Sequence, residues 1–242
     1  MRENKIKIFI GFDTRERVAF HVLSHSIYSR ASSPVSITPL ILSQLKPLLW
    51  RNRSPLQSTD FAFSRFLVPY LCDFDGWAIF MDCDMLVLDD ISNLWDLRNK
   101  EYAVQVVKHD HKPSENTKFL GQAQLQYEKK NWSSVMLFNC TKCQRLDLEY
   151  INSASGLELH RFRWLENESL IGDLPKSWNH LAGYDPNHPI SDISNIHFTS
   201  GGPYYNEYQS TQYASVWFEE RNAMLHCEQL NKELHTPKEQ NK

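Results

Sequence analysis

An apolar run near the middle of the chain ends in two aspartates that are separated by one residue. The run is Trp77–Met81, and Asp82-Cys83-Asp84 follows it directly. Because alternate residues of an extended strand point to the same side, Asp82 and Asp84 can project together while Cys83 turns back. Two carboxylates placed in this way suit a hard divalent cation, which prefers oxygen ligands and can hold phosphate oxygens at its other positions. The spacing therefore predicts a metal site at a strand end.

The segments around this pair alternate between strand and helix patterns. Apolar and β-branched runs predict strands over Lys5–Phe12, Val35–Leu42, Trp77–Met81, Tyr102–Val107 and Ser133–Asn139. Helical spacing of apolar residues predicts helices over Arg17–Arg30, Ser58–Leu71 and Thr211–Leu234. This alternation favours an α/β fold with a mostly parallel central sheet flanked by helices. Ligands of such sheets gather at the carboxyl ends of the strands, where Asp13 and the aspartate pair both fall.

The composition narrows the class of protein. The chain has 242 residues, of which 41% are hydrophobic and 12% aromatic, as in a globular enzyme. Lys and Arg number 26 against 29 Asp and Glu, and this balance predicts no nucleic-acid partner. No apolar run is long enough to span a membrane, no hydrophobic leader is evident, and five cysteines do not form an even disulfide set. We therefore expect a cytoplasmic protein, with peripheral membrane association left open by the apolar residues of the last helix.

Six short segments, in order, resemble one enzyme family. They are Ile8-Phe9-Ile10-Gly11-Phe12-Asp13, Ser64-Arg65-Phe66-Leu67-Val68-Pro69, Phe80-Met81-Asp82-Cys83-Asp84, Ser133-Ser134-Val135-Met136-Leu137-Phe138-Asn139, Leu174-Pro175-Lys176-Ser177-Trp178-Asn179 and Ile196-His197-Phe198. Together they are similar to the glycogenin- and galactosyltransferase-like glycosyltransferases of the family-8 type, which have a GT-A fold. The resemblance spans about residues 5 to 205 and implies a catalytic domain over 1–210, with a nucleotide-sugar half (1–107) and an acceptor half (108–210). A C-terminal helix and polar tail (211–242) would follow.

The resemblance implies transfer of a sugar from a nucleoside diphosphate donor, usually a uridine diphosphate sugar, to an acceptor hydroxyl with retention of configuration. The acceptor would be a glycan, a lipid-linked sugar or a small molecule. The cation would be Mn²⁺ or Mg²⁺, held by Asp82, Asp84 and His197. Without the resemblance, a hydrogen-bonded histidine at a strand end is the favoured explanation of His197, and the resemblance reverses that preference. The donor contacts that it implies are Asp13, Thr14, Arg65 and the segment containing Asp82 and Cys83.

Three departures from the family pattern leave parts of this interpretation open. Glu166-Asn167-Glu168 takes the place of the family's Asp-Gln-Asp, so Asn167 and Glu168 are the candidates that orient the acceptor or the reacting sugar. Trp132-Ser133-Ser134 replaces Asn-Ser/Ala-Gly, which narrows backbone access near the donor sugar. The diphosphate-binding lysine after the histidine is missing, and Arg65, Lys108 or the backbone amides of Gly201 and Gly202 are its candidate replacements.

Two other classes of function remain as alternatives. One is a protein of the same fold that binds a sugar nucleotide without turnover. The other is a phosphohydrolase of the haloacid-dehalogenase type, whose Asp-x-Asp includes a nucleophile. That motif normally follows the first strand and has Thr or Val two residues further on, whereas here the pair is central and Leu86 stands there.

Overall fold

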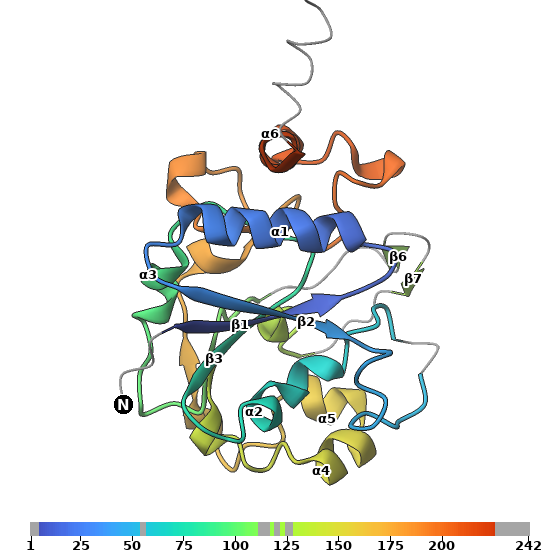
Figure 1. Cartoon of the computed structure of the whole chain (residues 1–242), viewed down its shortest axis with the longest axis vertical. Helices are drawn as coiled ribbons and strands as arrows, with labels where there is room; N and C mark the ends of the chain where they lie inside the picture. Colours follow the sequence, from blue (N-terminus) through green and yellow to red (C-terminus); the bar gives the residue numbers. More distant parts are fainter. Residues whose placement is uncertain (1–4, 54–56, 111–116, 119–121, 124–127, 226–242) are drawn as a thin grey trace, which may run out of the picture.

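A six-stranded sheet forms the centre of the molecule (Figure 1). The structure, a computed structural model, describes residues 5–53, 57–110, 117–118, 122–123 and 128–225. The strands lie in the order β2-β1-β3-β8-β5-β9. Their bounds are Val35–Ile41 (β2), Ile6–Phe12 (β1), Trp77–Met81 (β3), Val135–Asn139 (β8), Val104–Val106 (β5) and Ile171–Asp173 (β9). Only β8 runs against its neighbours β3 and β5, so the prediction of a mostly parallel sheet is confirmed.

Helices cover both faces of this sheet. On one face lies α1 (Arg17–Arg30), with α6 (Ala214–Leu225) packed outside it, and on the other lie α2 (Val68–Leu71), α4 (Leu148–Ser153) and α5 (Gly156–His160) (Figure 1). The short helix α3 (Ile91–Trp95) is capped at its N-terminus by Asp90, whose carboxylate accepts a hydrogen bond from the Ser92 amide. Because both faces are covered, β3 and β8 are buried along almost their whole length, and their residues are apolar except for Asn139 at the end of β8.

A smaller sheet begins directly after the aspartate pair that follows β3. It has the order β10-β11-β4, with β4 at Met85–Val87, β10 at His180–Leu181 and β11 at Asn195–His197. Two further residue pairs, β6 (Thr117–Lys118) and β7 (Gln122–Ala123), form a separate antiparallel ladder. A second apolar cluster, which includes Val22, Leu86, Ile196 and Trp217, fills the space between the smaller sheet, α1 and α6. The smaller sheet is thereby held at a fixed position against α1.

Some predicted elements are longer than those observed. The predicted helix over Ser58–Leu71 is wrong for its first half, since the chain turns until a 3₁₀ segment begins at Ser64 and α2 follows at Val68. In this turn the Asp60 amide donates to the Asp13 carboxylate at 3.0 Å, and the Ala62 amide donates to the Thr59 carbonyl, three positions earlier, rather than to a carbonyl four positions earlier as in an α-helix. The strand predicted from Ser133 begins at Val135, and residues Trp132–Ser134 form a 3₁₀ turn.

The last predicted helix starts later than expected. Tyr213 has a φ of 62°, which no helix interior accepts, and α6 therefore begins at Ala214 rather than Thr211. The predicted continuation to Leu234, the polar tail, and most of the predicted loop over 108–126 lie outside the described residues. Among the helices that the structure does describe, none has both the length and the apolar character that a membrane crossing requires.

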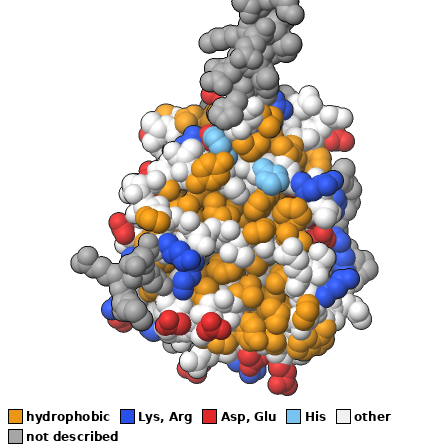
Figure 2. Space-filling model, viewed as in Figure 1, with side chains coloured by type: hydrophobic (Ala, Val, Ile, Leu, Met, Phe, Trp, Pro, Cys, Tyr) orange, Lys and Arg blue, Asp and Glu red, His pale blue; other side chains and the backbone are white. Residues whose placement is uncertain are grey.

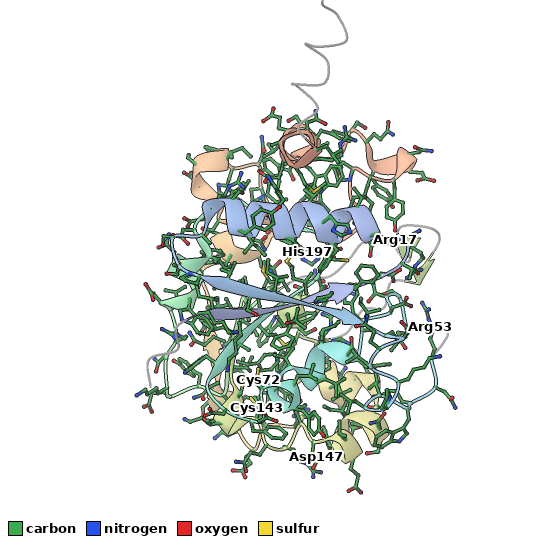
Figure 3. The ribbon with its side chains drawn as sticks, in the orientation of Figure 1. Arg17, Arg53, Cys72, Cys143, Asp147 and His197 are labelled. Carbon is green, nitrogen blue, oxygen red and sulfur yellow. The ribbon has the colours of Figure 1, made fainter. Side chains whose placement is uncertain are left out.

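Cys140 and Cys143 are buried free thiols beside β8. Cys72 and Cys143 lie on the side of the sheet that carries α2 (Figure 3). On the surface, hydrophobic side chains gather toward the end of the molecule that holds α2, α4 and α5 (Figure 2). Leu157 of α5 and Trp50 are among the exposed large hydrophobic residues.

Candidate metal centre

The three predicted metal ligands come together where the two sheets meet. Asp82 and Asp84 lie in the link between β3, a strand of the main sheet, and β4, a strand of the smaller sheet. Strand β11 pairs antiparallel with β4, which places His197 opposite Met85. Two backbone hydrogen bonds fix the link, since the Asp82 amide donates to the Ser134 carbonyl and the Phe198 amide donates to the Asp84 carbonyl, each at 2.9 Å. Side chains 113 positions apart along the chain thus share one site.

One ligand atom from each of Asp82, Asp84 and His197 lies within 4.8 Å of the other two. The His197 Nε2 atom is 3.4 Å from Asp84 Oδ1. All three residues are largely buried, and Figure 3 shows His197 in the interior of the molecule. Two carboxylates and one imidazole nitrogen form an oxygen-rich donor set that suits Mn²⁺ or Mg²⁺ better than a thiophilic ion. The residues present therefore fit a divalent cation.

The orientation of the His197 ring is set by Asn179. The Asn179 Oδ1 atom lies 2.9 Å from His197 Nδ1 and is an acceptor, so the Nδ1–H group donates to it. The other ring nitrogen, Nε2, faces Asp84 and is the one directed toward the candidate cation site. Asn179 is itself fixed, because its amide nitrogen donates to Ser134 Oγ at 2.9 Å and to the Asn131 carbonyl at 3.3 Å. A histidine that ligates a metal commonly has such a partner on its far nitrogen.

Arg65 supplies a positive charge beside the acidic pair. Its NH1 group lies 2.9 Å from Asp82 Oδ1 and donates to the Ser133 carbonyl at 2.7 Å. The guanidinium packs over the rings of Phe61 and Phe80, and the residue is only 5% exposed. A buried carboxylate needs this kind of partner, because removal of its charge from water is costly. The arginine that the sequence places near the donor thus contacts the centre directly.

Asp13 organises the loop that follows β1. Its buried carboxylate accepts from the Arg15 amide at 2.9 Å, from Arg15 Nε at 2.8 Å and from the Asp60 amide. Burial opposes ionisation of Asp13, but these hydrogen bonds and the charge of Arg15 outweigh it and lower the pKa of the carboxyl. Thr14 is exposed beside it, and its carbonyl accepts from Arg17. Donor contacts by Asp13 and Thr14 stay predictions.

Asn167 and Glu168 lie just before β9. The Asn167 side chain accepts a hydrogen bond from the Ser169 amide at 2.9 Å. Glu168 is exposed, and its Oε1 atom accepts from Lys129 Nζ at 2.6 Å. The hydrogen bond and charge of Lys129 lower the pKa of Glu168, so this side chain stays an anion. Lys129 lies two positions before Asn131, which connects this pair to the segment that supports Asn179.

Gly201 and Gly202 form a tight turn after β11. The Gly201 amide donates to the Phe198 carbonyl at 2.9 Å, and Gly201 has a φ of 147°. A side chain at either glycine would overlap a tyrosine ring, that of Tyr208 at Gly201 and that of Tyr204 at Gly202. Both positions therefore require glycine, and the turn stays close to the rings. Their predicted role toward phosphate stays a prediction.

Cys83 turns away from the aspartates into the core, as its strand position predicts, and it is fully buried. Burial, with the negative charges of Glu16, Asp84 and Asp82, raises the pKa of the thiol well above its usual range. Because the side chain is buried in the core, a donor contact by Cys83 would involve its backbone, and it stays a prediction. Sequence patterns indicate no role for Ser134 or Glu16, and Asn179 is only one residue of a segment that resembles the family. The only available signal was the position of Asn179 inside a family-like segment.

The sheet order and the buried acidic centre define the molecule as a GT-A glycosyltransferase fold. Three solved structures share it at low sequence identity. The bifunctional glycosyltransferase WbbM has a TM-score of 0.60 at 14% identity, over 90% of this chain and 50% of that one. The glycosyltransferase GlyE of Streptococcus pneumoniae has 0.59 at 17%, over 99% and 66%. The galactosyltransferase LgtC, solved with donor and acceptor sugar analogues, has 0.57 at 11%, over 90% and 96%. The chain thus spans half of the WbbM chain and about two thirds of GlyE.

Sequence comparison defines the family more closely. Residues 19–149 match glycosyl transferase family 8. Protein CDI of Arabidopsis thaliana is 45% identical over 234 residues, which cover 94% of this chain and 88% of that protein. The chain belongs to glycosyl transferase family 8, a family of nucleotide-sugar-dependent glycosyltransferases, and the resemblance inferred from the six segments is confirmed. The structure adds that the two predicted halves share one sheet, since β8 and β9 lie beside β3 and β5.

Proposed function

We propose that this protein is a metal-dependent glycosyltransferase that moves a sugar from a nucleoside diphosphate donor, a uridine diphosphate sugar by family resemblance, to an acceptor hydroxyl with retention. The observation that carries the proposal is the convergence of Asp82, Asp84 and His197 within 4.8 Å. Mn²⁺ or Mg²⁺ bound there would act as a Lewis acid that stabilises charge on the departing diphosphate.

The residues around the centre prepare it for this task. Asn179 keeps His197 Nε2 directed at Asp84, so the third ligand needs no rearrangement. Arg65 holds Asp82 in place by an ion pair, and its own guanidinium is fixed by a hydrogen bond to the Ser133 carbonyl. Burial of the three ligands excludes water, and electrostatic interactions inside the site are stronger as a result.

The acceptor end of the site is assigned to Asn167 and Glu168. Because Lys129 keeps Glu168 ionised, this carboxylate can accept a hydrogen bond from an acceptor hydroxyl but cannot donate one. Because Glu168 is held in an ion pair with Lys129, it is better suited to positioning the acceptor than to nucleophilic attack. A front-face transfer, in which the departing diphosphate takes the acceptor proton, requires from the protein only positioning and charge stabilisation.

A donor panel with and without Mn²⁺ tests this function. We expect one nucleoside diphosphate to raise the melting temperature only when Mn²⁺ is present, and the matching sugar nucleotide to release that nucleoside diphosphate slowly by hydrolysis. Release of inorganic phosphate alone would instead support the phosphohydrolase alternative. Metal-dependent binding without release of nucleoside diphosphate, with every acceptor class tried, would support a binding protein without turnover.

A further inference from the structure

Glu16 is a fully buried carboxylate at the start of α1, and the reaction as described gives it no task. A carboxylate is rarely buried unless other groups compensate its charge. Glu16 follows the loop of Asp13 and Arg15 directly, so it belongs to the first of the three segments that carry predicted donor-binding residues.

The contacts of Glu16 reach the other two segments. Its Oε1 atom accepts a hydrogen bond from the Tyr204 hydroxyl at 2.6 Å. Its Oε2 atom lies 3.9 Å from the Cys83 sulfur, and Cys83 separates the two aspartates of the centre. Tyr204 comes seven positions after His197 and ends the turn of Gly201 and Gly202. One side chain thus contacts residues from both sides of the candidate cation site.

The turn after β11 lacks the diphosphate-binding lysine that the family pattern places there, and the backbone amides of Gly201 and Gly202 are among its candidate replacements, so the position of this turn matters for diphosphate binding. The Tyr204 ring packs directly on Gly202, where a side chain would overlap it, and lies 5.5 Å from the Trp217 ring of α6. Burial and the nearby charge of Glu16 raise the pKa of Tyr204 well above its usual range, so the hydroxyl stays a donor. The hydrogen bond to Glu16 ties this packed ring to the segment of Asp82 and Asp84.

We propose that Glu16 is a positioning residue for the cation and diphosphate: through Tyr204 it holds the turn of Gly201 and Gly202 against Asp82-Cys83-Asp84. This inference rests on the proposed function. It assigns to the hydrogen-bonded pair of Glu16 and Tyr204 the positioning of a turn whose backbone amides are candidate diphosphate contacts. Because Glu16 lies behind Cys83 and not among the ligands, it acts through Tyr204 and does not touch the donor.

The test uses variants that separate the hydrogen bond from the charge. Tyr204→Phe removes only the hydroxyl, Glu16→Gln keeps an acceptor oxygen but removes the charge, and Glu16→Ala removes both. Tyr213→Phe is the matched control for the phenol, since the Tyr213 hydroxyl bonds to the His188 backbone. Glu220→Gln is the control for the carboxylate, because Glu220 is also buried and bridges α6 to His25 and Arg30 of α1. Urea unfolding establishes that each variant is folded.

Two quantities are measured: the Mn²⁺ dissociation constant by electron paramagnetic resonance, and metal-free amide hydrogen exchange of peptides covering 198–205. We expect Tyr204→Phe and Glu16→Ala to weaken Mn²⁺ binding about 10-fold or more and to speed exchange in this segment, as loss of an outer-shell support does. Glu16→Gln should stay within about threefold of the wild type, and so should both controls.

Unchanged Mn²⁺ affinity and unchanged exchange in Tyr204→Phe would overturn the proposal. The proposal would also be overturned if Glu16→Gln lost as much Mn²⁺ affinity as Glu16→Ala while Tyr204→Phe lost none. The charge of Glu16, and not its hydrogen bond with Tyr204, would then support Mn²⁺ binding. The exchange measurement needs no metal. If the wild type failed to bind Mn²⁺, the proposed function would be contradicted, whereas the contact between Glu16 and the turn would still be decided by the exchange rates.

Discussion

Replacement of Asn179 by alanine tests the geometry of the metal centre without altering any ligand. The side chain is fully buried and makes three hydrogen bonds, one with His197 Nδ1, one to Ser134 Oγ and one to the Asn131 carbonyl. In Asn179→Ala the imidazole loses the acceptor of its Nδ1–H group. The ring orientation that directs Nε2 at Asp84 is then no longer favoured over other orientations. Loss of such support costs about 10- to 100-fold in metal affinity, which equals about 1.4–2.7 kcal/mol. The lost hydrogen bonds destabilise the fold by about 2–3 kcal/mol.

The matched control is Asn195→Ala. Asn195 is also fully buried, two positions before His197, and its amide donates to the Trp178 carbonyl at 2.9 Å rather than to the histidine ring. We expect it to lose about 1–2 kcal/mol of unfolding free energy in urea while its Mn²⁺ affinity by calorimetry stays within about threefold. If Asn179→Ala bound Mn²⁺ as tightly as the wild type, or if both variants lost affinity in proportion to their stability, the assigned role of Asn179 would be refuted.

Three further outcomes are expected. Asp84→Asn should reduce Mn²⁺-dependent hydrolysis of the sugar nucleotide by about 10²-fold or more, measured as nucleoside diphosphate release, and unchanged Mn²⁺ affinity would contradict the ligand assignment. Arg65→Met should lower the urea unfolding free energy by about 3–5 kcal/mol because it leaves the buried Asp82 carboxylate without this charge, and a loss below about 1 kcal/mol would show that the pair is dispensable. The lowered pKa of Asp13 means that its contribution to stability is present above its ordinary value of 3.8 and is lost as pH falls through the lower folded value. Acid titration by circular dichroism should therefore show a weaker dependence below about pH 4 in Asp13→Asn than in the wild type.

Local patterns of apolar residues predicted those helices and strands whose position follows from the burial of residues close together in the sequence. Helix α1 was predicted at Arg17–Arg30 and lies there, because Val22, Leu23 and Ile27 recur at helical spacing and all are buried. The strand before Asp82 was predicted from its continuous apolar run, since a strand of a sheet that is covered on both faces is apolar on both sides. The aspartate pair then follows at a strand end, and its chemistry is visible in three residues.

Long-range side-chain contacts decided what those patterns did not reveal. Where the first half of the predicted helix over Ser58–Leu71 was expected, the chain turns instead, and the Asp60 amide donates to the Asp13 carboxylate, 47 positions earlier. No window of neighbouring residues contains both partners. Asn179 and Glu16 have the same property, since their functional partners, His197 and Tyr204, become neighbours only when the sheets are assembled. His197 itself was selected through the family resemblance, because spacing alone did not separate a ligand from a hydrogen-bonded histidine.

The location of the centre follows from the way the two sheets divide the chain. Strands β3 and β4 are separated by three residues, yet each belongs to a different sheet, so Asp82-Cys83-Asp84 must bridge them. Backbone hydrogen bonds hold one end of this link to Ser134 beside β8 and the other end to Phe198 after β11. The same two segments supply the Asn179 support and the third ligand. A movement of either sheet would therefore separate the ligands, and cation binding should in turn stabilise the sheets against each other, because a ligand that binds only the folded state raises its stability.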